Sequence, residues 1–196
     1  MENKLDNFSF ANEKEIARSF SKRFQWEMVL IGLGQAVIFL SLWPLVILEF
    51  IPLSIGAPIA SLCALMAYLP SHEAQHGNYS RGKPSRRWID SLVSHVSLIT
   101  LMFPHHVMRA THMKHHAYTN DPQKDVDYDV ASSKSLLEVF VRTNSGTAKY
   151  DKHLEVFKDD KNFVKSFEKG ALVGLGYRGS LMVLVFFFPL EALFLW

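Results

Sequence analysis

Residues 28–48 read MVLIGLGQAVIFLSLWPLVIL, an uncharged run of 21 residues that decides the fold of this chain. An α-helix of about 20 apolar residues crosses the hydrocarbon core of a bilayer, which is about 30 Å thick. Glu49 and Pro52 interrupt the apolar sequence, and a second uncharged segment follows at residues 53–69. The pattern predicts a membrane hairpin with spans at about 28–48 and 53–70. Two buried helices of a soluble core are the alternative, and the absence of a polar stripe argues against them.

Basic residues are unevenly distributed around this hairpin. Of the 21 Lys and Arg residues, 5 precede Met28, 15 lie between Pro70 and Gly170, and none lies in the turn between the two spans. Lys and Arg favour the cytoplasmic side of a membrane protein. We therefore expect the amino terminus and the middle of the chain on the cytoplasmic face. The formal net charge of +2 argues against nucleic acid as a partner.

A third apolar segment, residues 171–196, predicts another span, and the sequence stops inside it. We therefore expect a single all-α, multi-pass integral membrane domain over residues 1–196, with a cytoplasmic cap at about 71–170 and the start of a second hairpin. A chain that stops within a span indicates the amino-terminal part of a longer protein.

Shorter elements are expected inside the cap. Residues 92–107 are apolar but contain three histidines, which favours an interfacial or re-entrant segment over a span. Residues 132–142 and 152–169 have amphipathic helical character. The single cysteine, Cys63, lies in an apolar run and is expected to be a small buried side chain.

Five histidines fall in two motifs, His72-Glu73-Ala74-Gln75-His76 and His112-Met113-Lys114-His115-His116. Positions i, i+3 and i+4 share one face of a helix, so each motif directs its imidazoles to one side. With nine histidines in 196 residues, about 0.02 His-x-x-His-His motifs are expected by chance. Imidazole binds iron, copper and zinc well. The sequence therefore predicts a metal site with His72, His76, His112, His115 and His116 as ligands.

The two motifs, with 35 residues between them, resemble the first and second histidine boxes of the membrane fatty acid desaturase superfamily, which includes carotenoid hydroxylases and ketolases. The run Thr119-Asn120-Asp121-Pro122, followed by Asp125 and Asp127, also looks like bacterial members. The resemblance is close over residues 53–127. It implies two iron ions, molecular oxygen as co-substrate, and a desaturase or hydroxylase acting on a fatty acyl chain or related lipid. It also implies an electron donor such as ferredoxin, rubredoxin or cytochrome b5, and an active site on the cytoplasmic face.

Ligand histidines usually donate their second ring N–H to a carboxylate or carbonyl. The candidates for this supporting role are Glu73, Asp90, His106, Asp121, Asp125 and Asp127. For the acidic run beginning at Asp125, a solvated loop is an equally good interpretation. His95 is expected to be a buried histidine with a hydrogen-bond partner. His105 and His106 are interpreted as interfacial polar residues, with additional donors or ligands as the alternative, and His153 is expected to have no metal role.

The superfamily has a third histidine box, and no such motif follows His116, because the only later histidine is His153. Five ligands are too few for a complete diiron centre, so the 196 residues alone are expected to be inactive. Two other interpretations remain open. His72-Glu73-x-x-His76 also matches a zinc metalloprotease, with Glu73 as general base, although that leaves the second motif unused. A non-catalytic, metal-binding membrane fragment is the other alternative.

Overall fold

The computed structural model describes residues 13–17, 23–143 and 147–196, and all regular elements in these segments are helical. After a short helix over residues 13–17, they are in chain order α2 (Trp26–Ile47), α3 (Leu53–Gln75), the 3-10 turn η1 (Pro84–Arg86), α4 (Arg87–Ser97), the 3-10 turn η2 (Leu98–Leu101), α5 (His105–Tyr118), α6 (Tyr128–Ala131), α7 (Leu136–Thr143), α8 (Thr147–Val156), α9 (Lys161–Phe187) and α10 (Pro189–Leu195). The predicted all-α fold is confirmed for the described residues.

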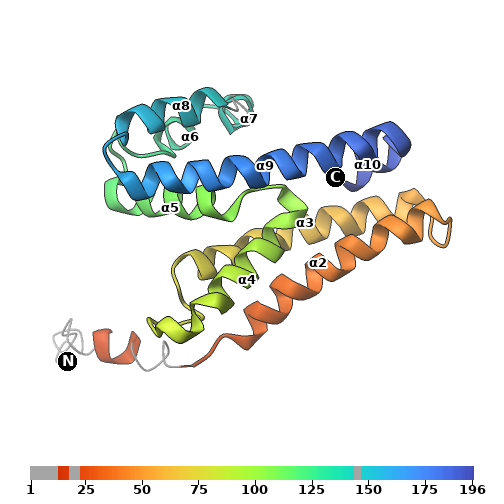
Figure 1. Ribbon diagram of the computed structural model, residues 1–196, viewed down its shortest axis with the longest axis horizontal. Helices are drawn as coiled ribbons and strands as arrows, with labels where there is room; N and C mark the ends of the chain where they lie inside the picture. Colours follow the sequence, from red (N-terminus) through yellow and green to blue (C-terminus); the bar gives the residue numbers. More distant parts are fainter. Residues whose placement is uncertain (1–12, 18–22, 144–146) are drawn as a thin grey trace, which may run out of the picture.

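Helices α2 and α3 form the predicted hairpin and lie side by side (Figure 1). The chain reverses over residues 48–52, where Glu49 takes a left-handed conformation with φ of 60°. At the other end of the hairpin, a Cβ atom on Gly32 would lie 2.5 Å from Ser97 Oγ and 2.8 Å from Pro70 Cβ. Only glycine therefore allows α2, α3 and α4 to approach this closely. Helix α3 continues past Pro70 to Gln75, which places His72 in its last turn.

The apolar core joins the hairpin to the carboxyl-terminal helix. Its buried residues are Phe39, Leu42, Trp43, Val46, Ala60, Cys63, Ala192 and Leu195. Trp196 meets Phe39 and Trp43 edge-on, with ring centroids 5.7 and 5.8 Å apart, and its Nε1 donates to the carbonyl of Thr100 at 3.2 Å. The expected burial of Cys63 is confirmed.

The third long apolar helix differs from the sequence-based prediction of a span over residues 171–196. Helix α9 begins at Lys161 because the Asp160 side chain accepts the N–H groups of Asn162 and Phe163 and so caps a new helix. It ends at Phe187, and Pro189, at the start of α10, marks the break. The predicted amphipathic helix at 152–169 is consequently divided between α8 and α9.

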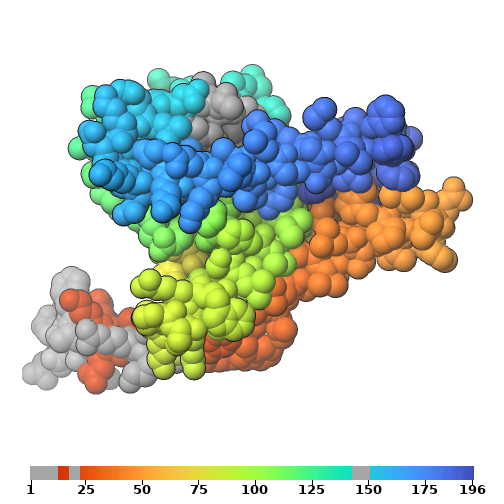
Figure 2. Space-filling model, in the orientation of Figure 1, coloured from red at the N-terminus to blue at the C-terminus, as the bar shows by residue number. Residues whose placement is uncertain are grey.

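Helices α2, α3 and α9 are each long and apolar enough to cross a membrane. They differ in how much of their apolar surface is covered, since 39% of the apolar window is buried in α2 and 6% in α9. Figure 2 shows α9 and α10, in blue, along the outer surface of one face of the molecule. The apolar side chains of α9 are therefore available for contact with lipid.

Two packing contacts bring α5 to the end of the hairpin. The interfacial segment predicted at 92–107 comprises the end of α4, η2 and the start of α5, and it lies against α2 and α3. Helix α5 then runs alongside α9 (Figure 1). They approach so closely that a Cβ atom on Gly170 would clash with the Val107 side chain. This arrangement leaves the last turn of α3 facing the middle and end of α5.

Candidate metal centre

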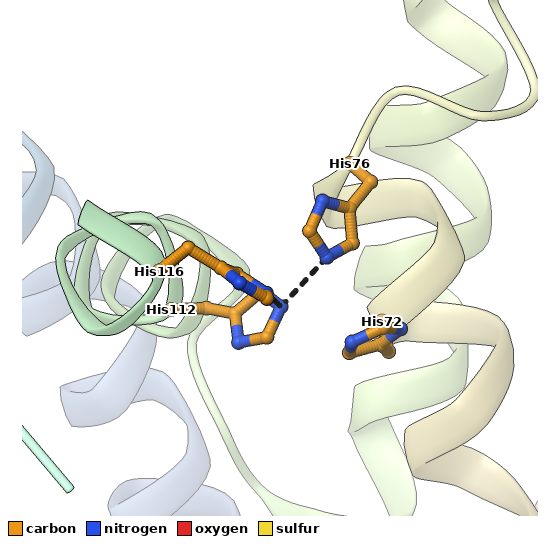
Figure 3. A group of neighbouring side chains, drawn as sticks. All are labelled: His72, His76, His112 and His116. Atoms are coloured by element: carbon orange, nitrogen blue, oxygen red, sulfur yellow. Dashed lines mark hydrogen bonds between the residues drawn. The ribbon is translucent and has the colours of Figure 1, made fainter. Parts of the chain in front are cut away.

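Four histidines from α3 and α5 meet at one point, and we call them the α3–α5 cluster (Figure 3). His72 lies in the last turn of α3 and His76 caps its end, while His112 and His116 are one turn apart on α5. Their potential ligand atoms all lie within 4.8 Å of one another. The spacing of each motif therefore places its imidazoles on one helix face, and the packing of α3 against α5 brings the two faces together.

The ring nitrogens face each other at the separation of atoms that share a metal ion. His112 Nε2 lies 2.9 Å from His76 Nε2 and 3.1 Å from His116 Nε2. Two imidazole nitrogens bound at about 2.1 Å to one ion, at right angles, are about 3.0 Å apart. Iron, copper and zinc all accept imidazole. The donor set therefore fits a transition metal bound by several neutral histidines.

Burial and neighbouring charges lower the pKa of two rings of this cluster, His112 and His76. Burial, together with the charges that His72, His116 and His76 would carry if protonated, lowers the pKa of His112 to about 4. Burial also lowers the pKa of His76, with further contributions from His72 and His116. Metal binding requires the deprotonated imidazole, so both rings are in the binding form at neutral pH.

His115, the fifth predicted ligand, lies outside this group of four. Its Nδ1 is 2.7 Å from Oδ1 of Asp125, whose carboxylate also accepts the backbone N–H groups of Asn120 and Asp127. Burial alone would raise the pKa of Asp125, but the hydrogen bonds from His115 and from the two backbone N–H groups outweigh it and lower the pKa. A buried, ionised carboxylate thus fixes the orientation of the His115 ring.

The other predicted supporting carboxylates have different environments. Asp127 Oδ2 is 3.9 Å from His115 Nδ1. Asp121 accepts the backbone N–H groups of Gln123 and Lys124 and so shapes the loop that carries Asp125. Glu73 Oε1 is 3.3 Å from His72 Nδ1, and its other oxygen accepts the side-chain N–H of Asn78 at 2.6 Å. Glu73 and Asp125 are therefore the carboxylates that lie within hydrogen-bond distance of predicted ligands.

Asp90 holds the turn that follows His76. Its carboxylate accepts the backbone N–H groups of Tyr79 and Ser80, next to Gly77, which takes a positive φ of 74°. This places Asp90 beneath the end of α3, where it fixes the direction in which the chain leaves His76.

Sequence reasoning missed a buried polar network behind the cluster. Gln75 Nε2 donates to Ser71 Oγ, which is 2.9 Å from Ser94 Oγ, and Ser94 Oγ is 2.6 Å from His105 Nδ1. Arg109 Nε donates to the carbonyl of Gln75 at 3.1 Å. Isolated serines carry no sequence signal for such a role, because the contacts exist only once α3, α4 and α5 are packed.

A cavity of about 710 Å³ adjoins the cluster. It lies between the end of α3, the start of α4, helix α5 and the first turns of α9, and its polar lining includes His76, Arg87, His105, His106, Arg109 and Lys114. Lys114 also pairs with Asp160 at 2.8 Å. The predicted residue His106 therefore lines this cavity and lies outside the α3–α5 cluster.

Comparisons with known proteins confirm the family resemblance seen in the sequence. The family described as fatty acid desaturase matches residues 48–196. Three curated relatives carry the name sn-1 oleoyl-lipid 12-desaturase. The protein from Anabaena variabilis is 28% identical over 98 residues, covering 50% of this chain and 25% of that protein. The one from Synechocystis sp. is 28% identical over 86 residues, covering 41% and 23%. The one from Picosynechococcus sp. is 33% identical over 58 residues, covering 30% and 16%.

The chain thus spans about a quarter or less of the length of these curated relatives. No solved structure matches significantly.

Proposed function

The chain belongs to the fatty acid desaturase family, and on this premise we propose that it carries the first two histidine boxes of an oxygen-dependent diiron desaturase or hydroxylase. The observation that carries the proposal is the convergence of His72, His76, His112 and His116 from two helices, with ring nitrogens 2.9 and 3.1 Å apart. The convergence is seen in the structure itself and adds to the assignment by family.

We assign His72, His76, His112, His115 and His116 as iron ligands. Iron bound at these histidines would supply the activation of molecular oxygen needed to remove hydrogen from an unactivated C–H bond. The chain contributes neutral imidazoles, which add no charge at the membrane boundary, and two helices, which hold them more rigidly than loops would. Asp125 supports the assignment of His115, because accepting a hydrogen bond from Nδ1–H leaves the Nε2 lone pair free and more basic.

The substrate we propose is the acyl chain of a membrane lipid. The curated relatives are named for action on an oleoyl lipid, and His72 and His76 lie at the end of a helix long enough to span a bilayer. An acyl chain could therefore reach the cluster from within the membrane. The distribution of Lys and Arg supports a cytoplasmic position for the cluster. A ferredoxin, a rubredoxin or cytochrome b5 would then deliver electrons from that side.

The zinc metalloprotease interpretation of His72-Glu73-x-x-His76 has less support. A protease of this type needs the Glu73 carboxylate as general base on a metal-bound water. In this structure Glu73 is engaged by Asn78 and lies beside His72 Nδ1. Moreover, His112 and His116 complete the site although the protease motif has no role for them. A non-catalytic metal-binding fragment shares the ligands and differs only in the absence of turnover.

The deciding experiment is done on the full-length protein, reconstituted with its lipid and a reducing system. We expect iron to be bound and the lipid product to be oxidised, as measured by metal analysis and mass spectrometry of the acyl chains. His76→Ala should abolish both iron loading and product formation. Iron binding without any oxidised product would favour the non-catalytic alternative, and hydrolysis of peptides would favour the protease.

A further inference from the structure

A second group of histidines lies outside the α3–α5 cluster. His95 is in the last turn of α4, and His105 and His106 begin α5. We call these three residues the α4–α5 trio. Their ring centroids are 4.6 Å apart for His95 and His105, 5.1 Å for His95 and His106, and 5.4 Å for His105 and His106. Three imidazoles therefore face one another where α4 and α5 meet.

In two of these rings, those of His95 and His105, Nδ1 makes a hydrogen bond. His95 Nδ1 lies 2.7 Å from the carbonyl oxygen of Ser91, which can only accept, so Nδ1 carries the proton and Nε2 keeps its lone pair. His105 Nδ1 lies 2.6 Å from Ser94 Oγ. Histidines that bind a metal through Nε2 are commonly held in this way, with Nδ1 hydrogen-bonded to a carbonyl or another acceptor.

Two rings of the trio, His105 and His106, have lowered pKa values. Burial, followed by the neighbouring His95, His106 and Arg109, lowers the pKa of His105 to about 3. Burial, His95 and Lys169 lower the pKa of His106. Arg109 and Lys169 are the cations that face the trio, and they disfavour a positive ion there as well as protonation. Among the described residues no carboxylate forms a hydrogen bond or ion pair with these rings, so a metal here would be held by imidazole donation alone.

The ring positions suit one ion with three imidazole ligands. A metal about 2.1 Å from a ring nitrogen lies about 3.2 Å from the ring centre, so two ligands at 90–109° have ring centroids about 4.5–5.2 Å apart. The observed range of 4.6–5.4 Å is close to this. Among the residues that the structure describes, only the α3–α5 cluster already has its ligand atoms gathered. His95 and His105 are held by their Nδ1 hydrogen bonds, so the ring that would turn to close the site is His106, whose rotation about Cβ–Cγ moves its nitrogens but hardly moves its ring centre.

We propose that His95, His105 and His106 form a second metal site, which takes a divalent transition ion of the Zn²⁺ class. Three imidazoles and one open position are a usual ligand set for Zn²⁺. His105 and His106 line the cavity beside the α3–α5 cluster, so the open position would face that cavity. The ion would tie the end of α4 to the start of α5, across a connection in which Met102 takes a left-handed conformation with φ of 51°.

This proposal is independent of the diiron assignment and can be tested separately. The variant His76→Ala/His112→Ala/His116→Ala of the full chain, purified in detergent and stripped with a chelator, is titrated with Zn²⁺ alone. We expect one Zn²⁺ to remain bound per chain by calorimetry and by metal analysis after gel filtration. Adding His106→Ala should remove it. Because His106 makes no side-chain hydrogen bond to the described residues, this change should leave the fold intact, which circular dichroism verifies.

A second measurement avoids the triple variant altogether. In the otherwise unaltered chain, His106→Ala should lower the Zn²⁺ stoichiometry by one, whereas His153→Ala, which removes a buried histidine of α8, should leave it unchanged. An unchanged stoichiometry in His106→Ala, or a folded triple variant that binds no Zn²⁺, would overturn the proposal. Both tests give the same answer whether or not the α3–α5 cluster binds a metal.

Discussion

The α3–α5 cluster and the α4–α5 trio use the same side chain in two different environments. Two histidines of the predicted iron site lie beside carboxylates, His115 beside Asp125 and His72 beside Glu73. The histidines of the trio are held by neutral partners, the carbonyl of Ser91 and the hydroxyl of Ser94. A carboxylate partner makes an imidazole a stronger ligand. We therefore expect the groups behind the rings, and not only the clustering of the rings, to make the predicted iron site the stronger of the two metal sites.

The largest effect should come from removing the ring at the centre of the α3–α5 cluster. His112 Nε2 is the atom that faces both His76 and His116. In the full-length protein we expect His112→Ala to abolish iron loading and lipid oxidation, as measured by metal analysis and product formation. His153→Ala is the matched control, since it also removes a buried imidazole but should retain the iron. Equal iron content in the two variants would mean that His112 is no more an iron ligand than the buried His153.

Asp125→Asn tests whether the carboxylate behind His115 makes the difference. The substitution keeps the size of the side chain but replaces the charged carboxylate, which accepts a hydrogen bond from His115 Nδ1, with a neutral amide. We expect metal affinity or activity to fall about 10- to 100-fold, measured by chelator competition and by turnover. The control is Asp121→Asn, because Asp121 caps the same loop through the backbone of Gln123 and Lys124. Similar losses in both variants would assign the effect to the loop.

His105, a member of the trio, should make the free energy of unfolding depend on pH. The pKa of His105 is about 3, well below the usual 6.5 for histidine, so the unfolded chain binds the proton more readily. The stability that His105 contributes is therefore complete above about pH 6.5 and is lost as the pH falls from about 6.5 towards 3. The loss is of the order of a few kcal/mol, since one pKa unit corresponds to about 1.36 kcal/mol.

Denaturation curves recorded across this pH range, with a chelator present, measure the effect. His105→Gln cannot titrate, so its stability should vary less steeply with pH than that of the unaltered chain. An identical slope in both would mean that His105 is not the group that couples folding to protons.

The smallest effect is expected at Glu73. It lies beside His72 but also accepts from Asn78, and glutamine can keep that contact. Glu73→Gln should therefore retain the metal and lower lipid oxidation only about 2- to 5-fold, well below the factors of 10² or more typical of a lost general base. A loss of activity as complete as that of His112→Ala would place Glu73 in the chemistry itself and revive the protease interpretation.

Much of the hairpin could be predicted from the sequence, because hydrophobic length and charge act locally. The predicted spans at 28–48 and 53–70 correspond to α2 at Trp26–Ile47 and α3 at Leu53–Gln75. The third span was less predictable. The predicted span began where the charged residues end, but a helix begins at its cap. Asp160 caps α9, which therefore starts ten residues before the predicted span.

The histidine spacing likewise predicted which rings share a helix face, and the convergence of His72, His76, His112 and His116 agrees with it. It named Asp125 as a candidate partner but could not predict that His115 is the histidine beside it, since that contact depends on the loop after α5. Nor could it predict the Ser71–Ser94–His105 network, whose members are far apart in sequence and meet only through tertiary packing. The role of each of these residues as a ligand remains a prediction.

Asp160 has a mechanical consequence for the protein in its bilayer. One carboxylate both caps the first turn of α9 and pairs with Lys114, which lies between His112 and His115 on α5. The contact between Gly170 and Val107 joins the same two helices farther along. A long apolar helix adjusts its tilt when the thickness of the membrane changes. If α9 crosses the bilayer, such a tilt would either carry α5 with it or break the pair with Lys114, and a change in bilayer thickness would then alter the spacing between the two histidine motifs.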